Sequence, residues 1–104
     1  MDKFKLKKKL VFIVGGAGLI GKEISKLAIK AESEVIILDV NKMESKEIIK
    51  KINNKKIKYE FFDCTDTSNL SKNFKKIIKK YGCPNVFINC SYPVSRDWKN
   101  SSFE

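Results

Sequence analysis

Glycines that could cradle a phosphate follow directly on an apolar run near the N-terminus, where residues 10–21 read LVFIVGGAGLIG. Gly16, Gly18 and Gly21 satisfy the pattern G-x-G-x-x-G, in which small residues permit a tight turn and a close approach of pyrophosphate to the backbone. The pattern alone has little weight. It gains meaning between a strand and a helix, because the amides and the dipole at a helix N-terminus attract an anion.

An acidic residue stands where a dinucleotide site would need one. Asp39 follows the apolar run 35–38, roughly 20 residues past the glycines, and there it would accept hydrogen bonds from an adenosine ribose. A 2′-phosphate within ~4 Å of this carboxylate would meet a repulsion on the order of 4 kcal/mol at an effective dielectric constant of about 20. We therefore expect NAD rather than NADP, although Lys42 could reverse part of this preference by folding back toward the ribose. In the plainer alternative, the glycines only make a turn and Asp39 only ends a strand.

The composition describes one small globular domain. The chain has 104 residues, of which 42% are hydrophobic and 33% are charged, with a net charge of +10. Arg96 is the only arginine, so lysine supplies nearly all of the positive charge. Because nucleic-acid-binding surfaces favour the planar guanidinium of arginine, we expect the lysines to form a solvated surface, with no nucleic-acid partner.

Cysteine usage points to a reducing compartment. Cys64, Cys83 and Cys90 form no C-x-x-C pair, and the sequence contains no histidine. We therefore expect neither a metal site nor a disulfide framework, and a cytoplasmic protein. The apolar run 10–14 is cut short by glycines, which argues against a signal peptide, and no stretch approaches the ~20 apolar residues of a transmembrane helix.

Hydrophobic periodicity predicts an alternation of strands and helices. Four runs of apolar and β-branched residues are typical of buried strands: 10–14, 35–38, 57–62 and 86–88. Apolar residues at helical spacing occupy the three stretches between them: Ile20, Ile24, Leu27, Ala28 and Ala31; Ile48, Ile49 and Ile52; Leu70, Phe74, Ile77, Ile78 and Tyr81. We expect Asp66 or Thr67 to cap the last of these helices, and Gly82 and Pro84 to end it.

The order β-α-β-α-β-α-β predicts a doubly wound α/β fold, Rossmann-like, with a parallel sheet, right-handed crossovers and helices on both faces. We expect half of such a fold, with strand order 3-2-1-4, as a single domain over residues 1–104. Residues 92–104 form a polar segment that we expect to be poorly ordered.

With these elements in place, the chain resembles the short-chain dehydrogenases/reductases. The resemblance covers nearly the whole chain, but only the N-terminal half of a typical member. The glycine stretch is closest to the family's T-G-G-A-G-x-x-G form, with Val14 in place of the threonine and Leu19 in place of a glycine common in the shorter branch. The resemblance implies that the cofactor is bound by Gly15, Gly16, Gly18, Leu19, Ile20 and Gly21.

Two further stretches match the family. Asp63 and Cys64 lie where an acidic turn after the third strand reads the adenine edge, although Asp63 and Asp66 could simply be turn and cap residues. Residues 89–91, Asn89, Cys90 and Ser91, lie where the N-N-A-G signature ends the fourth strand, and Cys90 and Tyr92 depart from it. The stretch 89–93 is similar to a variant in oxidoreductases of surface-sugar and flagellin-modification pathways, which implies a carbonyl, alcohol or sugar substrate.

The family's catalytic serine and its Tyr-x-x-x-Lys are absent from this sequence, and Tyr92 is followed by Arg96 at the lysine position. We therefore expect no catalytic residue here. The chain is expected to bind NAD as the N-terminal part of a short-chain oxidoreductase. The alternative is a non-catalytic NAD-binding or partner-binding module.

An incomplete fold has consequences for its surface. The fourth strand would form an open edge at Val86, Phe87 and Ile88, and missing helices would leave Leu10 and Phe12 exposed. We expect self-association or a complementing chain, as for a fragment, a split gene product or a stand-alone remnant.

Overall fold

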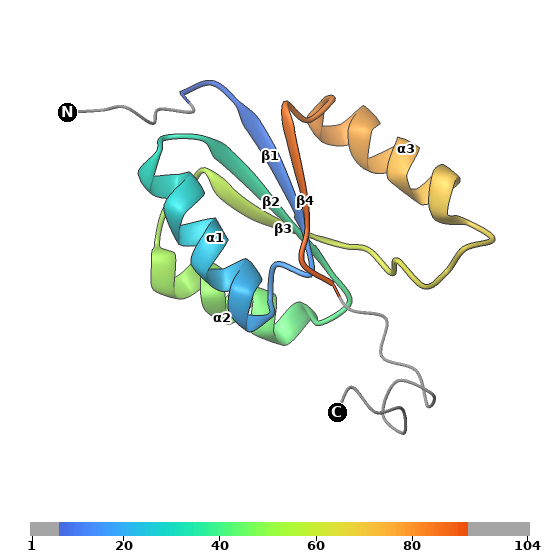
Figure 1. Cartoon of the computed structure of the whole chain (residues 1–104), viewed down its shortest axis with the longest axis horizontal. Helices are drawn as coiled ribbons and strands as arrows, with labels where there is room; N and C mark the ends of the chain where they lie inside the picture. The colour runs from blue at the N-terminus through green and yellow to red at the C-terminus, as the bar shows by residue number, and fades with distance from the viewer. Residues whose placement is uncertain (1–6, 92–104) are drawn as a thin grey trace, which may run out of the picture.

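The computed structural model describes residues 7–91 and contains seven elements in strict alternation (Figure 1). The strands are β1 (Leu10–Val14), β2 (Glu34–Asp39), β3 (Ile57–Phe61) and β4 (Val86–Asn89). The helices are α1 (Leu19–Lys30), α2 (Lys42–Ile52) and α3 (Leu70–Tyr81). Each predicted strand and helix is present. The segment 92–104, including Tyr92 and Arg96, lies outside the described residues.

The four strands form one parallel sheet with the order β3-β2-β1-β4, as predicted. Val11 on the central strand β1 pairs with Val35 on β2 and with Val86 on β4. Parallel strands align their carboxyl ends along one edge of the sheet. The glycine turn, Asp39 and the segment after Asn89 therefore converge at that edge.

Helices α1 and α2 cover one face of the sheet and α3 covers the other (Figure 1). Successive strand residues point to opposite faces, so Val11 and Ile13 pack beneath α1 and α2, whereas Phe12 and Val14 pack beneath α3. Strands buried on both faces have no polar alternation, which explains the continuous apolar sequence of β1.

Phe74 anchors α3 to the sheet. Its ring makes edge-to-face contacts with Phe12, Phe62 and Phe87, at centroid distances of 6.0, 6.1 and 5.6 Å. Phe12 is consequently fully buried, and the expectation that a missing helix would expose it was wrong because α3 reaches across from β3 to cover β1. Leu10 is also partly buried against this cluster, while Phe87 on β4 remains 49% exposed.

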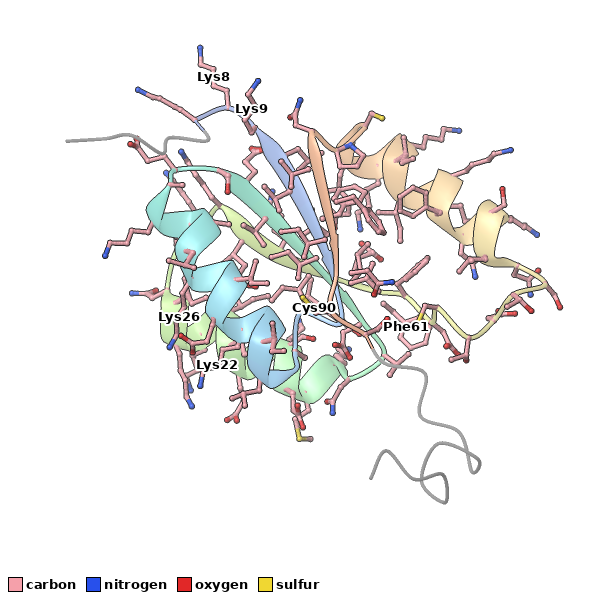
Figure 2. The ribbon with its side chains drawn as sticks, in the orientation of Figure 1. Lys8, Lys9, Lys22, Lys26, Phe61 and Cys90 are labelled. Atoms are coloured by element: carbon pink, nitrogen blue, oxygen red, sulfur yellow. The ribbon has the colours of Figure 1, made fainter. Side chains whose placement is uncertain are left out.

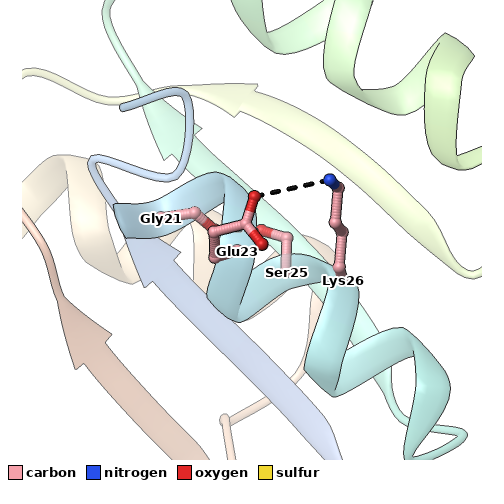
Figure 3. Close-up of polar contacts among 4 residues, drawn as sticks. All are labelled: Gly21, Glu23, Ser25 and Lys26. Carbon is pink, nitrogen blue, oxygen red and sulfur yellow. Dashed lines mark hydrogen bonds and ion pairs between the residues drawn. The ribbon is translucent and has the colours of Figure 1, made fainter. Parts of the chain in front are cut away.

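The buried face of α1 differs from the predicted stripe. Ala28 is buried and Ile24 packs against the core as predicted, but Ile20 and Leu27 are 51% and 65% exposed. Gly21 and Ser25, which were not in the predicted stripe, are buried instead. The Ser25 hydroxyl donates to the Gly21 carbonyl at 2.8 Å, which satisfies the polar group inside the core (Figure 3). Small residues on this face let the start of α1 lie close to β1.

Glu23 and Lys26 form an exposed contact of 3.4 Å on the outer surface of α1 (Figure 3). The prediction that Asp66 or Thr67 caps α3 was wrong, because Asn69 occupies the N-cap position. Asp66 instead accepts weak hydrogen bonds of 3.3 Å from the Asn69 side chain, one turn before the helix. Gly82 ends α3 as predicted, with a φ of +100°.

Candidate dinucleotide-binding site

The turn between β1 and α1 is so tight that its first glycine has a left-handed backbone. Gly15 has a φ of +77° and donates its amide to the carbonyl of Leu38 on β2 at 2.7 Å. A Cβ on Gly15 would lie 2.8 Å from the backbone nitrogen of Ser91, just after β4. The turn therefore lies against the ends of both strands that flank β1, with no room for a side chain at its start.

Two further glycines are required by packing within the protein. A Cβ on Gly16 would lie 2.8 Å from Cγ2 of Ile37, a side chain with no exposed surface. A Cβ on Gly21 would overlap the carbonyl oxygen of Gly15 and lie 2.6 Å from the Cα of Gly16. Backbone atoms cannot rotate aside as the end of a side chain can, so Gly21 allows α1 to lie directly on the turn.

Gly18 has no such internal constraint. It is the N-cap of α1, with φ −76° and ψ 176°, an extended conformation that any residue adopts. The nearest atom to a Cβ built on Gly18 is the carbonyl oxygen of Gly15 at 3.4 Å, an ordinary van der Waals distance. Neither backbone conformation nor packing within the described chain requires glycine here.

The first turn of α1 presents backbone amides beside Gly18. The Lys22 amide donates to the Gly18 carbonyl at 2.9 Å, and the amides of Leu19 and Ile20 precede this first helical hydrogen bond. The first turn contains no acidic residue. The Leu19 side chain is 81% exposed and, with that of Ile20, projects into solvent. An anion at this position would meet free donors and the positive end of the helix dipole.

Asp39 connects the end of β2 to the glycine turn. Its Oδ2 accepts a hydrogen bond from the Ala17 amide at 3.1 Å, and its Oδ1 accepts one from the Asn41 amide at 2.8 Å. The Tyr59 hydroxyl donates to the Asp39 carbonyl at 2.9 Å. Each carboxylate oxygen retains a further lone pair for another donor. Lys42 lines a different hollow, beside Tyr59 on β3.

The turn after β3 is organised around a charged carboxylate. Asp63 Oδ1 accepts hydrogen bonds from the Thr65 hydroxyl at 2.6 Å and from the Thr65 amide at 2.9 Å. These two bonds, the hydroxyl first, hold the pKa of Asp63 below its ordinary value of 3.8 because they stabilise the ionised form. The thiol of Cys64, between them in sequence, contacts the Ser91 hydroxyl with Sγ and Oγ 3.5 Å apart.

The segment after β4 repeats the same turn. Asn89 Oδ1 accepts hydrogen bonds from the Ser91 hydroxyl at 2.6 Å and from the Ser91 amide at 3.0 Å. Cys90, between them, donates its amide to the Val14 carbonyl at 2.7 Å and lies where β4 ends (Figure 2). Burial raises the pKa of the Cys90 thiol, which keeps it protonated and disfavours a nucleophilic role.

These turns line one cleft of about 330 Å³ at the carboxyl edge of the sheet. It brings together seven of the residues indicated by the sequence: Gly15, Gly18, Asp39, Asp63, Cys64, Cys90 and Ser91. The other five adjoin it through the turn, the helix and the strand end: Gly16, Leu19, Ile20, Gly21 and Asn89.

Three residues of the cleft were not indicated by the sequence patterns: Val40, Phe62 and Thr65. Thr65 could have been identified, because an aspartate two residues before a threonine favours a turn closed by side-chain hydrogen bonds. Val40 and Phe62 follow their strands without any recognisable motif, so only the folded chain reveals their position.

Other kinds of site receive little support over residues 7–91. No group of three or more Cys, Asp or Glu side chains in that range could hold a metal ion, and no helix there could cross a membrane. A separate hollow on the outer side of α3 is basic and is lined by Ser68, Ser71, Lys72, Lys75, Lys76 and Lys79. It contains no glycine turn, and all of its lining residues except Ser68 belong to α3.

The family model of the short chain dehydrogenases matches residues 9–92, which include every element described above. The chain belongs to this family. The resemblance noted from the glycine turn and the strand ends is thus confirmed. Among curated proteins, the chain is similar to the "Post-translational flagellin modification protein A" of Campylobacter coli, with 28% identity over 96 residues. The match covers 89% of this chain and 38% of that protein.

Solved structures share the fold. A short chain dehydrogenase from Bacillus anthracis is 26% identical with a TM-score of 0.71, over 83% of this chain and 35% of that one. The structure of gox2181 is 19% identical with a TM-score of 0.74, over 86% and 35% of the two chains. A 3-ketoacyl-(acyl-carrier-protein) reductase from Brucella melitensis, complexed with NADH, is 18% identical with a TM-score of 0.68, over 80% and 34%. The chain thus spans little more than a third of its relatives' lengths.

Proposed function

We propose that this chain binds NAD through its adenosine and pyrophosphate groups, as the cofactor-binding part of a short-chain oxidoreductase. The observation that carries the proposal is the contrast between Gly18 and its neighbours. Gly15, Gly16 and Gly21 are explained by contacts inside the protein, whereas a side chain on Gly18 would meet nothing closer than 3.4 Å. Glycine at this position is accounted for if a ligand occupies the space beside it.

The pyrophosphate would be held beside Gly18 at the start of α1. The amides of Leu19 and Ile20 supply donors there, and the helix dipole favours negative charge. The fit is supported by the first turn of α1, which contains no carboxylate to repel the phosphates. The hydride chemistry itself is supplied by the bound nicotinamide.

Asp39 would accept hydrogen bonds from the adenosine ribose and favour NAD over NADP. The Ala17 and Asn41 amides hold its carboxylate in place without exhausting its lone pairs. A 2′-phosphate about 4 Å away would meet a repulsion on the order of 4 kcal/mol at a dielectric constant near 20, before screening. Lys42 is directed to the hollow beside β3 rather than the cleft, which argues against its neutralising that phosphate.

The two matching turns would form the far wall of the site. Asp63 and Cys64 would face the adenine, while Asn89, Cys90 and Ser91 would lie beside the glycine turn. This role is supported by the contact between Cys64 and Ser91, which joins the two turns at the cleft. It is also supported by the two hydrogen bonds from Thr65, which fix the Asp63 carboxylate beside the cleft.

The substrate proposed for the complete enzyme is a carbonyl or alcohol compound, and a sugar is the narrower choice that the flagellin modification relative supports. We place the protein in the cytoplasm on the strength of its three free thiols.

Calorimetric titration with NAD and ADP-ribose tests the proposal. The parent should bind both ligands, since both carry the adenosine and pyrophosphate groups. Gly18→Val should abolish binding while leaving the circular dichroism spectrum unchanged. Asn69→Val is the matched control, because it places the same side chain at the N-cap of α3, away from the cleft. Unchanged affinity in a folded Gly18→Val variant would show that the site lies elsewhere.

A further inference from the structure

The side chain of Tyr59 reaches the ribose-binding aspartate from β3. Tyr59 pairs with Ile37 of β2, and Asp39 is two residues further along that strand. The ring of Tyr59 packs against the core on the face covered by α1 and α2. Its hydroxyl donates a hydrogen bond to the backbone carbonyl of Asp39 at 2.9 Å. Tyr59 thus contacts a residue of the nucleotide cleft without lining the cleft itself.

Hydrogen bonds, rather than packing, hold the end of β2 in place. Asp39 is the last residue of the strand, and the chain bends at Val40 before α2 begins. The side chain of Val40 is 54% exposed, so it contributes little buried contact to the bend. The direction of the Asp39 carboxylate is therefore set by the groups that donate to this residue.

Donors from three separate segments meet at Asp39. Besides the Tyr59 hydroxyl, the Phe62 amide donates to the same carbonyl at 3.2 Å, and the Ala17 amide donates to the carboxylate at 3.1 Å. Each of these distances lies in the longer part of the usual range for its kind of hydrogen bond. The Asn41 amide makes a shorter bond of 2.8 Å, but it belongs to the bend and moves with it. No single bond fixes the bend, so the loss of one loosens it.

The Tyr59 hydroxyl is kept available as a donor. Burial, followed by the negative charges of Asp39 and Glu60, raises the pKa of Tyr59 above its ordinary value of 10.0, so the phenol stays protonated at neutral pH. Glu60 does not compete for this hydroxyl, because its carboxylate accepts hydrogen bonds from Lys80 at 3.0 Å and from the Tyr81 hydroxyl at 2.8 Å.

We propose that Tyr59 is a positioning residue for nucleotide selectivity, which holds Asp39 so that its carboxylate faces the adenosine ribose. This inference rests on the function proposed above. Without the Tyr59 hydroxyl, the bend gains freedom and the carboxylate can move away from the ribose. NAD then loses hydrogen bonds to its 2′-hydroxyl, and NADP escapes part of the repulsion at its 2′-phosphate. Both changes reduce the preference for NAD.

Calorimetric titration of the full chain with ADP and 2′-deoxy-ADP measures this effect at the ribose. Tyr59→Phe removes one hydroxyl and keeps the ring that packs against the core, so the variant should remain folded. The parent should prefer ADP, and Tyr59→Phe should reduce that preference by about three- to tenfold, as expected for one hydrogen bond of ordinary strength. The ratio of NAD to NADP affinity should fall in the same direction. A general loss of stability would weaken both members of each pair equally and leave the ratios unchanged.

Tyr81→Phe is the matched control. Tyr81 is also partly buried, and its hydroxyl also donates a hydrogen bond, but to Glu60 on the face covered by α3. This variant should keep the selectivity of the parent. In a background of Asp39→Ala, Tyr59→Phe should have no further effect on either ratio, because Tyr59 acts through Asp39.

An amide NMR spectrum reports the same coupling without any ligand. Tyr59→Phe should shift the resonance of the Ala17 amide, which donates to the Asp39 carboxylate, and Tyr81→Phe should not. If the parent binds neither nucleotide, the proposed function fails and this inference fails with it. If the parent distinguishes ADP from 2′-deoxy-ADP and Tyr59→Phe does so equally well, or if Tyr81→Phe has the same effect, the role of Tyr59 is refuted while the proposed function stands.

Discussion

Two glycines that are two residues apart in the same turn should respond to alanine in opposite ways. A methyl group on Gly16 would press on Ile37, a fully buried residue, at 2.8 Å. The same methyl group on Gly18 would meet only the Gly15 carbonyl oxygen, at 3.4 Å, in a backbone conformation that alanine adopts readily. Gly16→Ala therefore tests packing inside the protein, and Gly18→Ala tests the space outside it.

The magnitudes follow from these contacts. Overpacking a core by one methyl group costs about 1–3 kcal/mol. Alanine regains about 0.4–1 kcal/mol because the unfolded chain is less flexible. Gly16→Ala should then lower the free energy of unfolding by about 1–2 kcal/mol. Each kcal/mol lost should lower the melting temperature by about 4–8 °C. For Gly18→Ala the same gain offsets a weaker N-cap, so stability should change by less than about 0.5 kcal/mol.

Binding should show the reverse order. At equal fraction folded, Gly18→Ala should bind ADP-ribose at least about tenfold more weakly, which is ~1.4 kcal/mol, because the methyl group occupies the phosphate's space. Gly16→Ala should retain most of its affinity below its melting temperature. Thermal unfolding followed by circular dichroism, with calorimetry at a low temperature, gives both quantities. If Gly18→Ala were the less stable variant, or if it bound as the parent does, the distinction between the two glycines would be mistaken.

Three further outcomes are expected. Asp39→Ala should narrow the ratio of NAD to NADP affinity in calorimetry, and an unchanged ratio would move the selectivity to another residue. Phe74→Leu removes three edge-to-face contacts worth ~0.5–1.5 kcal/mol each. In urea titrations it should therefore lower the free energy of unfolding by about 2–4 kcal/mol. A loss below ~0.5 kcal/mol would show that other contacts attach α3 to the sheet. Folding lowers the pKa of Asp63, so its stabilising effect is present above the ordinary value of 3.8 and lost as pH falls through the folded value. The stability difference between the parent and Asp63→Asn should therefore vanish in acid, and a difference that persists there would contradict this reasoning. Thr65→Val removes the principal hydrogen bond and should raise the pKa of Asp63 in an NMR titration, where no change would exclude that bond as the cause.

The parts of the fold that depend on local sequence could be predicted. The apolar run 10–14 and the glycines after it define a strand, a turn and a helix start without reference to the rest of the chain. The right-handedness of β-α-β units restricts the possible strand orders. The order 3-2-1-4 itself is that of a dinucleotide-binding fold, which the glycine turn between the first strand and the first helix indicated. The convergence of Asp39 and Asn89 at one edge is then a consequence of parallel strands.

The errors concern contacts between distant segments. Periodicity placed Leu27 in the buried stripe of α1, but α1 buries Gly21 and Ser25 instead. Ser25 can be buried because its hydroxyl donates a hydrogen bond to the Gly21 carbonyl, and the periodicity of apolar residues does not indicate such a bond. The burial of Phe12 depends on Phe74, more than sixty residues later in the chain, and no local pattern reports such a contact. The cap at Asn69 was missed because several polar residues before α3 were equally suitable.

Within residues 7–91, α3 is the one helix on its face of the sheet, and this arrangement has a consequence for synthesis. The ribosome releases β1, α1, β2, α2 and β3 before α3, so one side of the nascent three-stranded sheet can form complete with both of its helices. Until α3 emerges, Phe12, Val14, Ile36 and Leu38 on the other side have no cover. In the folded protein, detachment of α3 from the sheet would be the local unfolding event that allows amide protons to exchange and proteases to cut the chain. Chaperone dependence and proteolytic lifetime of this chain should therefore follow the docking of α3 more closely than the stability of the glycine turn.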